Sequence, residues 1–309
     1  MHALSLFPSL PIPLHVGAPE PGGPLYTHWR IEPGVALFIF GLTALYLAWV
    51  GPLNRRRPGS EDRPVSRGER TAFLGGSLAA LLALGPPVDD WSHFFFASAH
   101  MAQHLLLMLV AVPLWLLGIP AWVYRPAVRH PLLGPAGRWL TRPLPAFVIG
   151  TAINVVWHLP VLYDAALRVE ALHVLQHLCF LAAGVFLWWP LLSKVPEWPA
   201  LSPPLQCLYL FLQTVPGGII GAFITNAGAG LYAHYEEASV RPWGLGLKVD
   251  QEIAGLTMWV GTNTLFLVLI TIIFLRWAGQ EESRDRQRLP SGTKPGATRP
   301  ATSANPPGA

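Results

Sequence analysis

The chain has 309 residues, of which 52% are hydrophobic and only 12% are charged, and its formal net charge is +4. Soluble domains carry about 25% charged residues, so this composition excludes an ordinary soluble protein. The basic residues lie in loops between apolar runs, which argues against a nucleic-acid-binding surface. We therefore predict an all-α, polytopic membrane helix bundle that contacts the lipid bilayer and no nucleic acid.

Seven apolar runs meet the roughly 17 to 25 residues that a transmembrane helix needs. They lie at about 33–51, 71–88, 98–118, 143–159, 170–192, 203–226 and 250–277. Pro216-Gly217-Gly218 predicts a kink or break in the sixth run. Trp188, Trp189 and Trp277 are interpreted as residues of an interfacial aromatic belt.

The runs divide the chain into three parts. Residues 1–30 form an extracytoplasmic N-terminal segment, and residues 31–278 form a seven-helix membrane domain. Residues 279–309 are polar and rich in Pro, Ser, Gly and Arg, so we expect a disordered cytoplasmic tail.

Basic residues set the predicted orientation, because cytoplasmic loops are enriched in Lys and Arg. The loops after the first, third and fifth runs, together with the tail, hold all but four of the 21 Lys and Arg residues. This bias places the N-terminus outside the cell membrane and the C-terminus in the cytoplasm. We expect a multi-pass protein of the cell (inner) membrane. Of the 11 histidines only His130 then lies on the cytoplasmic side, so any histidine chemistry is expected to face outward.

The same six-residue pattern, H-x-x-Q-H-L, opens the third and the fifth runs. It begins at His100 and again at His173, and a Pro-Val pair begins 13 residues before each, at Pro87 and Pro160. The two copies are 73 residues apart without a gap. Such an internal repeat predicts a duplicated helical hairpin, an arrangement that often places a site where the repeats meet.

The spacing within each motif places two imidazoles on one helix face. Residues i and i+4 are one turn apart, about 6 Å along the axis. If the third and fifth helices pack together, His100, His104, His173 and His177 converge near the outer surface. The glutamine between each pair, Gln103 or Gln176, would orient an imidazole by a hydrogen bond.

Metal ligation is the interpretation that we favour for these paired histidines, since polar side chains inside a bilayer are costly and usually functional. A structural hydrogen-bond network is the alternative. Imidazole suits copper, zinc, iron and nickel. Met108, one turn after His104, would favour Cu(I), although packing is the commoner role of a lone methionine. The residues alone leave the ion open among these metals.

Several further residues are candidates for the same site. Asp250 opens the seventh run, and would ligate the metal, anchor an imidazole, or simply lie at a helix N-terminus where the dipole favours a carboxylate. His158, Asp90 and His93 are less certain ligands at the mouth of the cluster, where they would feed a cation inward or be solvated loop residues. The sequence has no Walker loop, G-x-S-x-G or H-E-x-x-H motif, so we predict no catalytic residues and no enzyme.

The combined pattern resembles a known family. The H-M-x-Q-H-L-L-L helix followed by Pro113 and Leu117-Gly118, and a last run that opens with Asp250-Gln251 before Gly255 and Trp259, are similar to the CtaG family over roughly residues 30–280. The resemblance implies a membrane factor that assembles bacterial haem-copper cytochrome c oxidase, with oxidase subunits as partners and copper delivery as a plausible role. Its motif maps onto His100, Gln103, His104 and Asp250.

Three other functions remain open from the sequence. A haem-binding membrane cytochrome or haem-modifying enzyme also uses histidines on facing helices, but two imidazoles on one helix cannot lie on opposite sides of one iron. A metal permease needs a polar path across the bilayer, and the inner halves of the third and fifth runs are apolar. A scaffold that only holds oxidase subunits would have purely structural histidines.

Overall fold

The computed structural model describes residues 32–56, 65–238 and 241–288, and within these ranges the chain is helical and has no β-strand. The first part contains α1 (Pro33–Val50), α2 (Pro52–Arg55), α3 (Arg67–Leu84), α4 (Val88–Phe94), α5 (Ala97–Leu106), the π-helical segment η1 (Leu107–Ala111), α6 (Val112–Gly118), η2 (Ala121–Tyr124), α7 (Arg125–Arg129), α8 (Leu133–Leu140) and α9 (Pro143–Trp157). The second part contains α10 (Pro160–Arg168), α11 (Glu170–Leu192), α12 (Pro203–Asn226), η3 (Ala233–Glu237), η4 (Pro242–Gly244), α13 (Leu247–Leu256), the π-helical segment η5 (Thr257–Gly261) and α14 (Thr262–Arg288). The prediction of an all-α fold is confirmed for these residues.

Six of the described helices are long and apolar enough to cross a membrane. They are Pro33–Arg55, Arg67–Phe94, Ala97–Gly118, Glu170–Leu192, Pro203–Asn226 and Leu247–Gln287. The predicted run at 143–159 corresponds to α9, whose 15 residues extend only about 22 Å at 1.5 Å per residue. α9 and α8 meet at a bend of 77° and make a seventh span if they are counted together.

The outward faces of the bundle support a lipid environment. Leu37, Leu144, Val161, Ile219 and Leu267 are each at least 63% exposed. Large apolar side chains on this scale are costly in water and favourable against acyl chains. The chain is a multi-pass membrane protein.

The helices are interrupted at other places than the sequence suggested. Of the kink or break expected at Pro216-Gly217-Gly218, the break is wrong, because α12 continues from Pro203 to Asn226. Transmembrane helices tolerate such prolines because neighbouring groups satisfy the freed carbonyl. The interruptions lie instead at η1 and η5, where five residues of each helix adopt π geometry.

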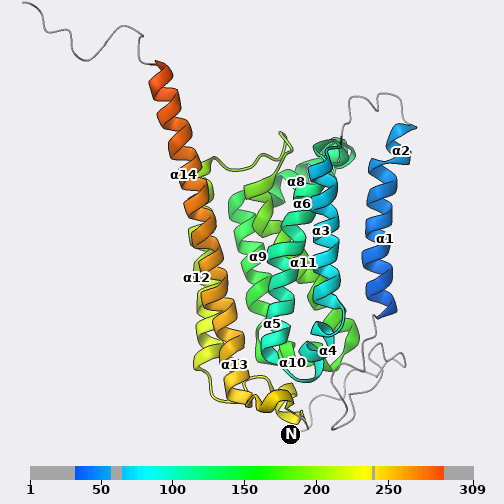
Figure 1. Ribbon diagram of the computed structural model, residues 1–309, viewed down its shortest axis with the longest axis vertical. Coiled ribbons are helices and arrows are strands. Elements are labelled where there is room, and N and C mark those ends of the chain that lie inside the picture. Colours follow the sequence, from blue (N-terminus) through cyan, green and yellow to red (C-terminus); the bar gives the residue numbers. More distant parts are fainter. Residues whose placement is uncertain (1–31, 57–64, 239–240, 289–309) are drawn as a thin grey trace, which may run out of the picture.

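The boundary of the C-terminal tail is also corrected. α14 runs to Arg288, so residues 279–288 are helical and the predicted disorder does not begin at 279. Figure 1 shows α14 extending past the rest of the bundle at the end where α2 and α8 lie. The predicted N-terminal segment (1–30) and residues 289–309 lie outside the described residues.

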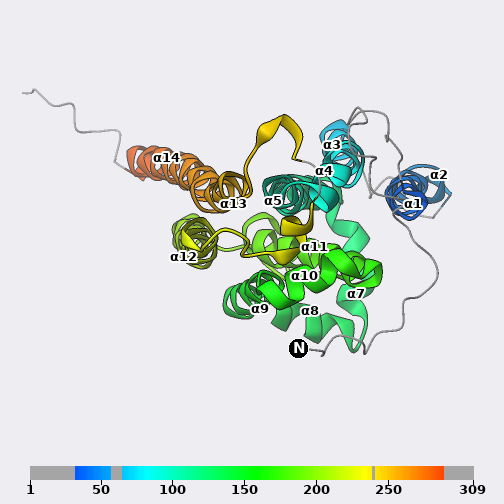
Figure 2. The ribbon, with the colours of Figure 1, turned by 90° about the horizontal axis from the view of Figure 1, so that it is seen from below.

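α11 lies in the middle of the helix arrangement. It packs against α9, α10, α6 and η1, while α5 packs against α13 and α3 against α6. Figure 2, seen from below, places α1 at one edge and α12 and α14 at the other. The motif face of each helix is turned toward the protein, since His100, His104 and His173 are buried, while Val174, Leu175 and Leu178 on the other side of α11 are 45–49% exposed.

Two of the tryptophans assigned to the interfacial belt are buried in this core. Trp188 and Trp189 are each 6% exposed. The Trp188 indole donates a hydrogen bond of 2.8 Å to the carbonyl of Met108 inside η1, and the Trp189 indole donates to the carbonyl of Trp198. The belt interpretation is therefore wrong for these two residues, which hold neighbouring segments together.

Candidate metal centre

The two H-x-x-Q-H-L motifs occupy equivalent places in the fold. One lies on α5 and the other on α11, and each helix follows a short helix, α4 or α10, at the same end of the bundle (Figure 1). α11 packs against η1 and α6, which continue α5. The repeat thus brings the two motif helices together, a proximity that the sequence did not determine.

The imidazoles of these motifs converge. The Nε2 atoms of His100 and His104 are 2.8 Å apart, which is a hydrogen bond that carries one shared proton. His177 adds a third nitrogen, and one nitrogen from each of these three rings lies within 4.8 Å of the others. The ring centre of His173 lies 4.4 Å from that of His177 and 5.4 Å from that of His100. We call His100, His104, His173 and His177 the histidine cluster.

The geometry of the cluster is close to that of a metal site. Bonds of roughly 2.0 Å from a metal to imidazole nitrogens place tetrahedral ligands about 3.3 Å apart. The separation of 2.8 Å between His100 and His104 therefore needs only a small ring rotation and loss of the shared proton. His100, His104 and His173 are at most 2% exposed, while His177 is half-buried. Neutral imidazoles screened from water in this way are suitable ligands for copper, zinc, iron or nickel.

Histidines outside the motifs extend the cluster in two directions. On one side, the ring of His158 is centred 6.5 Å from that of His104, and its Nδ1 donates to the carbonyl of Asn154 at 2.7 Å. This bond leaves Nε2 of His158 as the nitrogen with a lone pair.

On the other side, the ring of His93 is centred 5.6 Å from that of His173 and 5.8 Å from that of His234. Nε2 of His234 donates to the carbonyl of His93 at 2.8 Å. Both His93 and His234 are half-buried, so imidazoles continue from the buried cluster to a partly exposed position. The sequence analysis did not select His234, which comes from the loop before α13.

The carboxylate of Asp250 lies at the beginning of α5. One carboxylate oxygen accepts a 2.7 Å bond from the backbone N–H of Ala97, and the other accepts bonds from the N–H and the hydroxyl of Ser98. The fully buried Asp250 therefore satisfies the N-terminal donors of α5, the helix that carries His100. Asp250 thus positions the motif helix, and it also lies in the first turn of α13, as the helix-terminus alternative expected. Its role as a metal ligand stays a prediction.

Gln103 differs from its expected role of orienting an imidazole. Its amide donates to the carbonyl of Ala83 at 3.0 Å and to the carboxylate of Asp89 at 2.9 Å. These bonds join α5 to α3 and α4. Asp90, a less certain candidate ligand, lies half-buried on α4 and is outside the group of nitrogens that approach one another.

Three tyrosines close the cluster on the side of the loop after α12, and the sequence analysis missed all of them. The hydroxyl of Tyr235 donates to the carbonyl of Ser92 at 2.6 Å and lies 3.3 Å from Nδ1 of His100. The rings of Tyr163 and Tyr232 stack with centres 3.7 Å apart. Burial raises the pKa of Tyr163 and Tyr235 well above the ordinary value, so both remain neutral donors.

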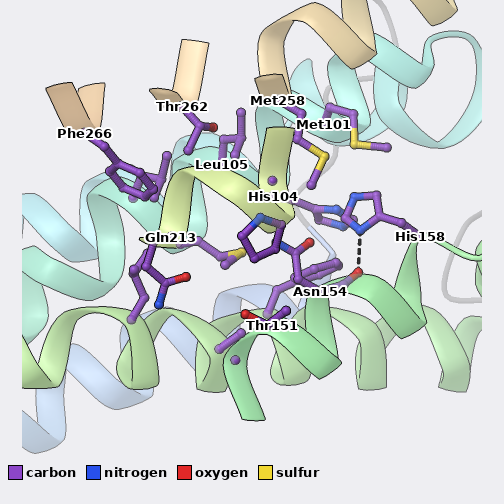
Figure 3. A pocket seen from close by; sticks show the side chains of 18 residues that line it. Met101, His104, Leu105, Thr151, Asn154, His158, Gln213, Met258, Thr262 and Phe266 are labelled. Atoms are coloured by element: carbon purple, nitrogen blue, oxygen red, sulfur yellow. Dashed lines mark hydrogen bonds between the residues drawn. The ribbon is translucent and has the colours of Figure 1, made fainter. Parts of the chain in front are cut away.

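A cavity of about 50 Å³ adjoins the cluster (Figure 3). It lies between α5, α9, α11, α12 and the helix formed by α13, η5 and α14, and His104 and His158 form part of its wall. Met108, which the sequence analysis selected as a soft ligand, lines this cavity from η1.

The comparisons with known proteins agree with the sequence pattern. The chain is 24% identical over 274 residues to an uncharacterised protein of Mycobacterium leprae, covering 83% of this chain and 40% of the relative. It is 25% identical over 273 residues to an uncharacterised protein of Mycobacterium tuberculosis, covering 82% of this chain and 40% of that relative. The chain thus spans about 40% of the length of the curated relatives it matches. No solved structure matches it significantly.

The sequence model of the family described as "Cytochrome c oxidase caa3 assembly factor" matches residues 44–280. This range includes both motif helices, Asp250 and the two π-helical segments. With the repeat, the membrane bundle and this match together, the chain belongs to the family of cytochrome c oxidase caa3 assembly factors.

Proposed function

We propose that this chain is a non-enzymatic assembly factor that binds copper at the histidine cluster and delivers it to a cytochrome c oxidase subunit in the same membrane. The observation that carries this proposal is the approach of the His100, His104 and His177 nitrogens to within 4.8 Å of one another. They come from two motif copies that are 73 residues apart in sequence, and they lie in the buried interior of the bundle.

The surroundings of the cluster suit the arrival of a cation. A groove of about 390 Å³ between α1, α3 and α11 reaches His173 and His177, and its lining includes the carboxyl groups of Glu32, Asp89 and Glu170. Carboxylates at this position attract a cation before the imidazoles take it up. Because His177 is half-buried while the other three imidazoles are buried, the cluster suits a site that releases its ion by ligand exchange rather than one that encloses it.

The direction of supply follows from the distribution of charge. The helix ends next to the cluster carry few basic residues, while Arg55, Arg67, Arg125 and Arg138 lie on elements toward the opposite end (Figure 1). Since cytoplasmic loops are enriched in Lys and Arg, the cluster would face the outside of the inner membrane. Copper would then arrive from the periplasmic or external side.

A haem protein is less well supported. His100 and His104 are successive turns of one helix with their Nε2 atoms 2.8 Å apart, so they cannot bind opposite faces of one haem iron. The cavity next to His104 is about 50 Å³, far below the 300 Å³ or so at which cofactor pockets begin. A Soret band in the purified protein would nevertheless favour the haem alternative over copper.

The experiment compares copper content in the purified full chain and in H100A/H104A/H177A. We expect the wild-type chain to retain copper after dialysis and the triple variant to lose it. The matched control is H130A, because His130 is exposed on the other end of the bundle. Circular dichroism establishes that the variants are folded. Equal copper in the wild-type chain and in the folded triple variant would end the proposal.

A second measurement separates delivery from scaffolding. Cells that express the triple variant should assemble oxidase deficient in copper, and added copper should partly restore its activity. If the variant supports full oxidase assembly at limiting copper, the histidines are structural and the protein acts only as a scaffold.

A further inference from the structure

Three methionine side chains form part of the wall of the cavity next to the histidine cluster. The sequence contains four methionines, and all three that follow Met1 line this one cavity: Met101, Met108 and Met258. They are 1%, 8% and 4% exposed and come from α5, η1 and η5. In Figure 3, the side chains of Met101 and Met258 lie on the same side of the cavity as His158.

Packing is the simplest explanation of a buried methionine, and it fits this arrangement poorly. Methionine is common in cores because its flexible chain fills irregular gaps. Here Met101 and Met258 belong to one apolar cluster and Met108 to another, yet all three border a space of about 50 Å³ that they leave open. That space is large enough for an ion or a few water molecules, since one water needs about 10 to 15 Å³ on this measure.

The backbone around two of the methionines is unusual in the same way. Met108 is the second residue of η1 and Met258 is the second residue of η5, and both segments are five-residue π helices inside longer α-helices. π-helical segments are rare and occur often at functional sites. Each of the two π segments carries a methionine whose side chain lines the same cavity.

His104 connects this cavity with the cluster. Its Nε2 is hydrogen-bonded to His100, whereas its Nδ1 is buried and has no hydrogen-bond partner among the described residues. Thr151 Oγ1 and Asn154 Oδ1 line the cavity from α9 and Thr262 Oγ1 lines it from α14, and these atoms also have no partner in the described part of the chain. A ligand or water is the ordinary way to satisfy such buried groups.

We propose that this cavity is a second, Cu(I)-selective site, in which Met101, Met108 and Met258 supply thioether ligands and His104 supplies an imidazole. Thioethers select Cu(I) over Zn(II) and other hard or borderline ions. Copper held by the cluster reaches this site by exchanging imidazole ligands for thioethers around His104, without change in its oxidation state. This inference rests on the proposed function, because the histidine cluster supplies the ion.

The experiment uses the full chain labelled with selenomethionine and loaded with Cu(I) under anaerobic conditions. X-ray absorption at the selenium edge detects copper bonded to selenium. We expect this signal in the wild-type chain and its loss in M101L/M108L/M258L, in which only Met1 still carries selenium. Leucine nearly conserves the volume of methionine, so the variant is expected to fold.

A competition measurement adds a readout that a packing role would not change. The triple Met variant should bind Cu(I) at least tenfold more weakly and Zn(II), which the imidazoles bind, with unchanged affinity. No change in Cu(I) affinity, or equal losses for both ions, would overturn the second site.

The outcomes separate this inference from the proposed function. Copper that depends on the histidines but gives no selenium–copper signal would refute the methionine site and leave the histidine cluster standing. A selenium–copper signal that persists in H100A/H177A would support the methionine site and refute the cluster as its source. Absence of bound copper in the wild-type chain would refute both.

Discussion

Asp250→Asn separates the structural role of this carboxylate from the ligand role that the sequence suggested. In the structure, the two carboxylate oxygens accept bonds from the N–H of Ala97, the N–H of Ser98 and the hydroxyl of Ser98 at the beginning of α5. Asparagine keeps one carbonyl oxygen and replaces the other by an amide that cannot accept a backbone N–H. One buried donor of α5 is then left without a partner.

The size of the effect follows from this loss. A buried donor without an acceptor costs about 1–3 kcal/mol, and a lost helix cap about 0.5–2 kcal/mol. Since both descriptions refer to the same bond, we expect the free energy of unfolding to fall by about 2 kcal/mol. His100 lies three residues after Ala97, so its ring should lose alignment, and copper affinity should fall by about tenfold, as for other groups that orient ligands.

The assay is unfolding by SDS in mixed micelles, followed by circular dichroism, with copper affinity measured on the same samples. Glu69→Gln is the matched control, because Glu69 accepts a bond from the backbone of Ser66 at the beginning of α3, on the exposed opposite end. That variant should lose well under about 1 kcal/mol and keep its copper affinity. If Asp250→Asn lost copper binding at unchanged stability, Asp250 would be a ligand and this account of it would be refuted.

Three further substitutions test the packing around the site. Gly255→Ala should destabilise the bundle by about 1–3 kcal/mol, since the new Cβ would lie 2.2 Å from the hydroxyl oxygen of Thr225 on α12. Gly261→Ala is the control and should be near neutral, because its Cβ would meet nothing within 4 Å. Thermal melts compare the two variants, and equal melting temperatures would contradict this close packing. Tyr235→Phe removes the hydroxyl that donates to the backbone of α4, and the free energy of SDS unfolding should fall by about 1 kcal/mol. Copper binding should persist in this variant. Complete loss of copper would make the hydroxyl a ligand. Trp188→Phe leaves the carbonyl of Met108 without the indole donor, and the free energy of unfolding should fall by about 1–3 kcal/mol in the same assay. An unchanged midpoint would show that the π segment does not need this bond.

Much of the fold was predictable because helix formation in a membrane depends on local composition. The apolar runs gave helices at nearly the expected positions, and the i, i+4 spacing correctly placed His100 beside His104 on one face. The local pattern failed where neighbours decide the backbone. Pro216 predicted a kink or break, and α12 continues through it without a break. The π geometry of η1 lies directly before Pro113, which has no N–H to bond the carbonyl of Leu109, so a local signal was present there and was not used. The helix that contains η5 has no proline, and nothing local predicted its interruption.

The candidate site shows the same division. Its paired imidazoles were predictable, because the repeat is local and ungapped. Tyr235 and His234 were not, since they approach the cluster from a loop more than 130 residues after His100, and chain separation of this kind leaves no periodic trace. Asp250 was selected for its unusual place in an apolar run, but only its partners reveal whether a carboxylate caps a helix or binds a metal.

The amino-acid sequence by itself determined that this protein is a membrane helix bundle and that two of its helices each present a pair of imidazoles on one face, because both properties depend on residues within a few turns of one another. Only the tertiary structure decided that the imidazoles of α5 and α11 approach one another, that Asp250 caps α5, and that three methionines line one cavity. Those relations depend on how helices pack across the bundle, and packing is set by the shapes of side chains that are distant in the sequence.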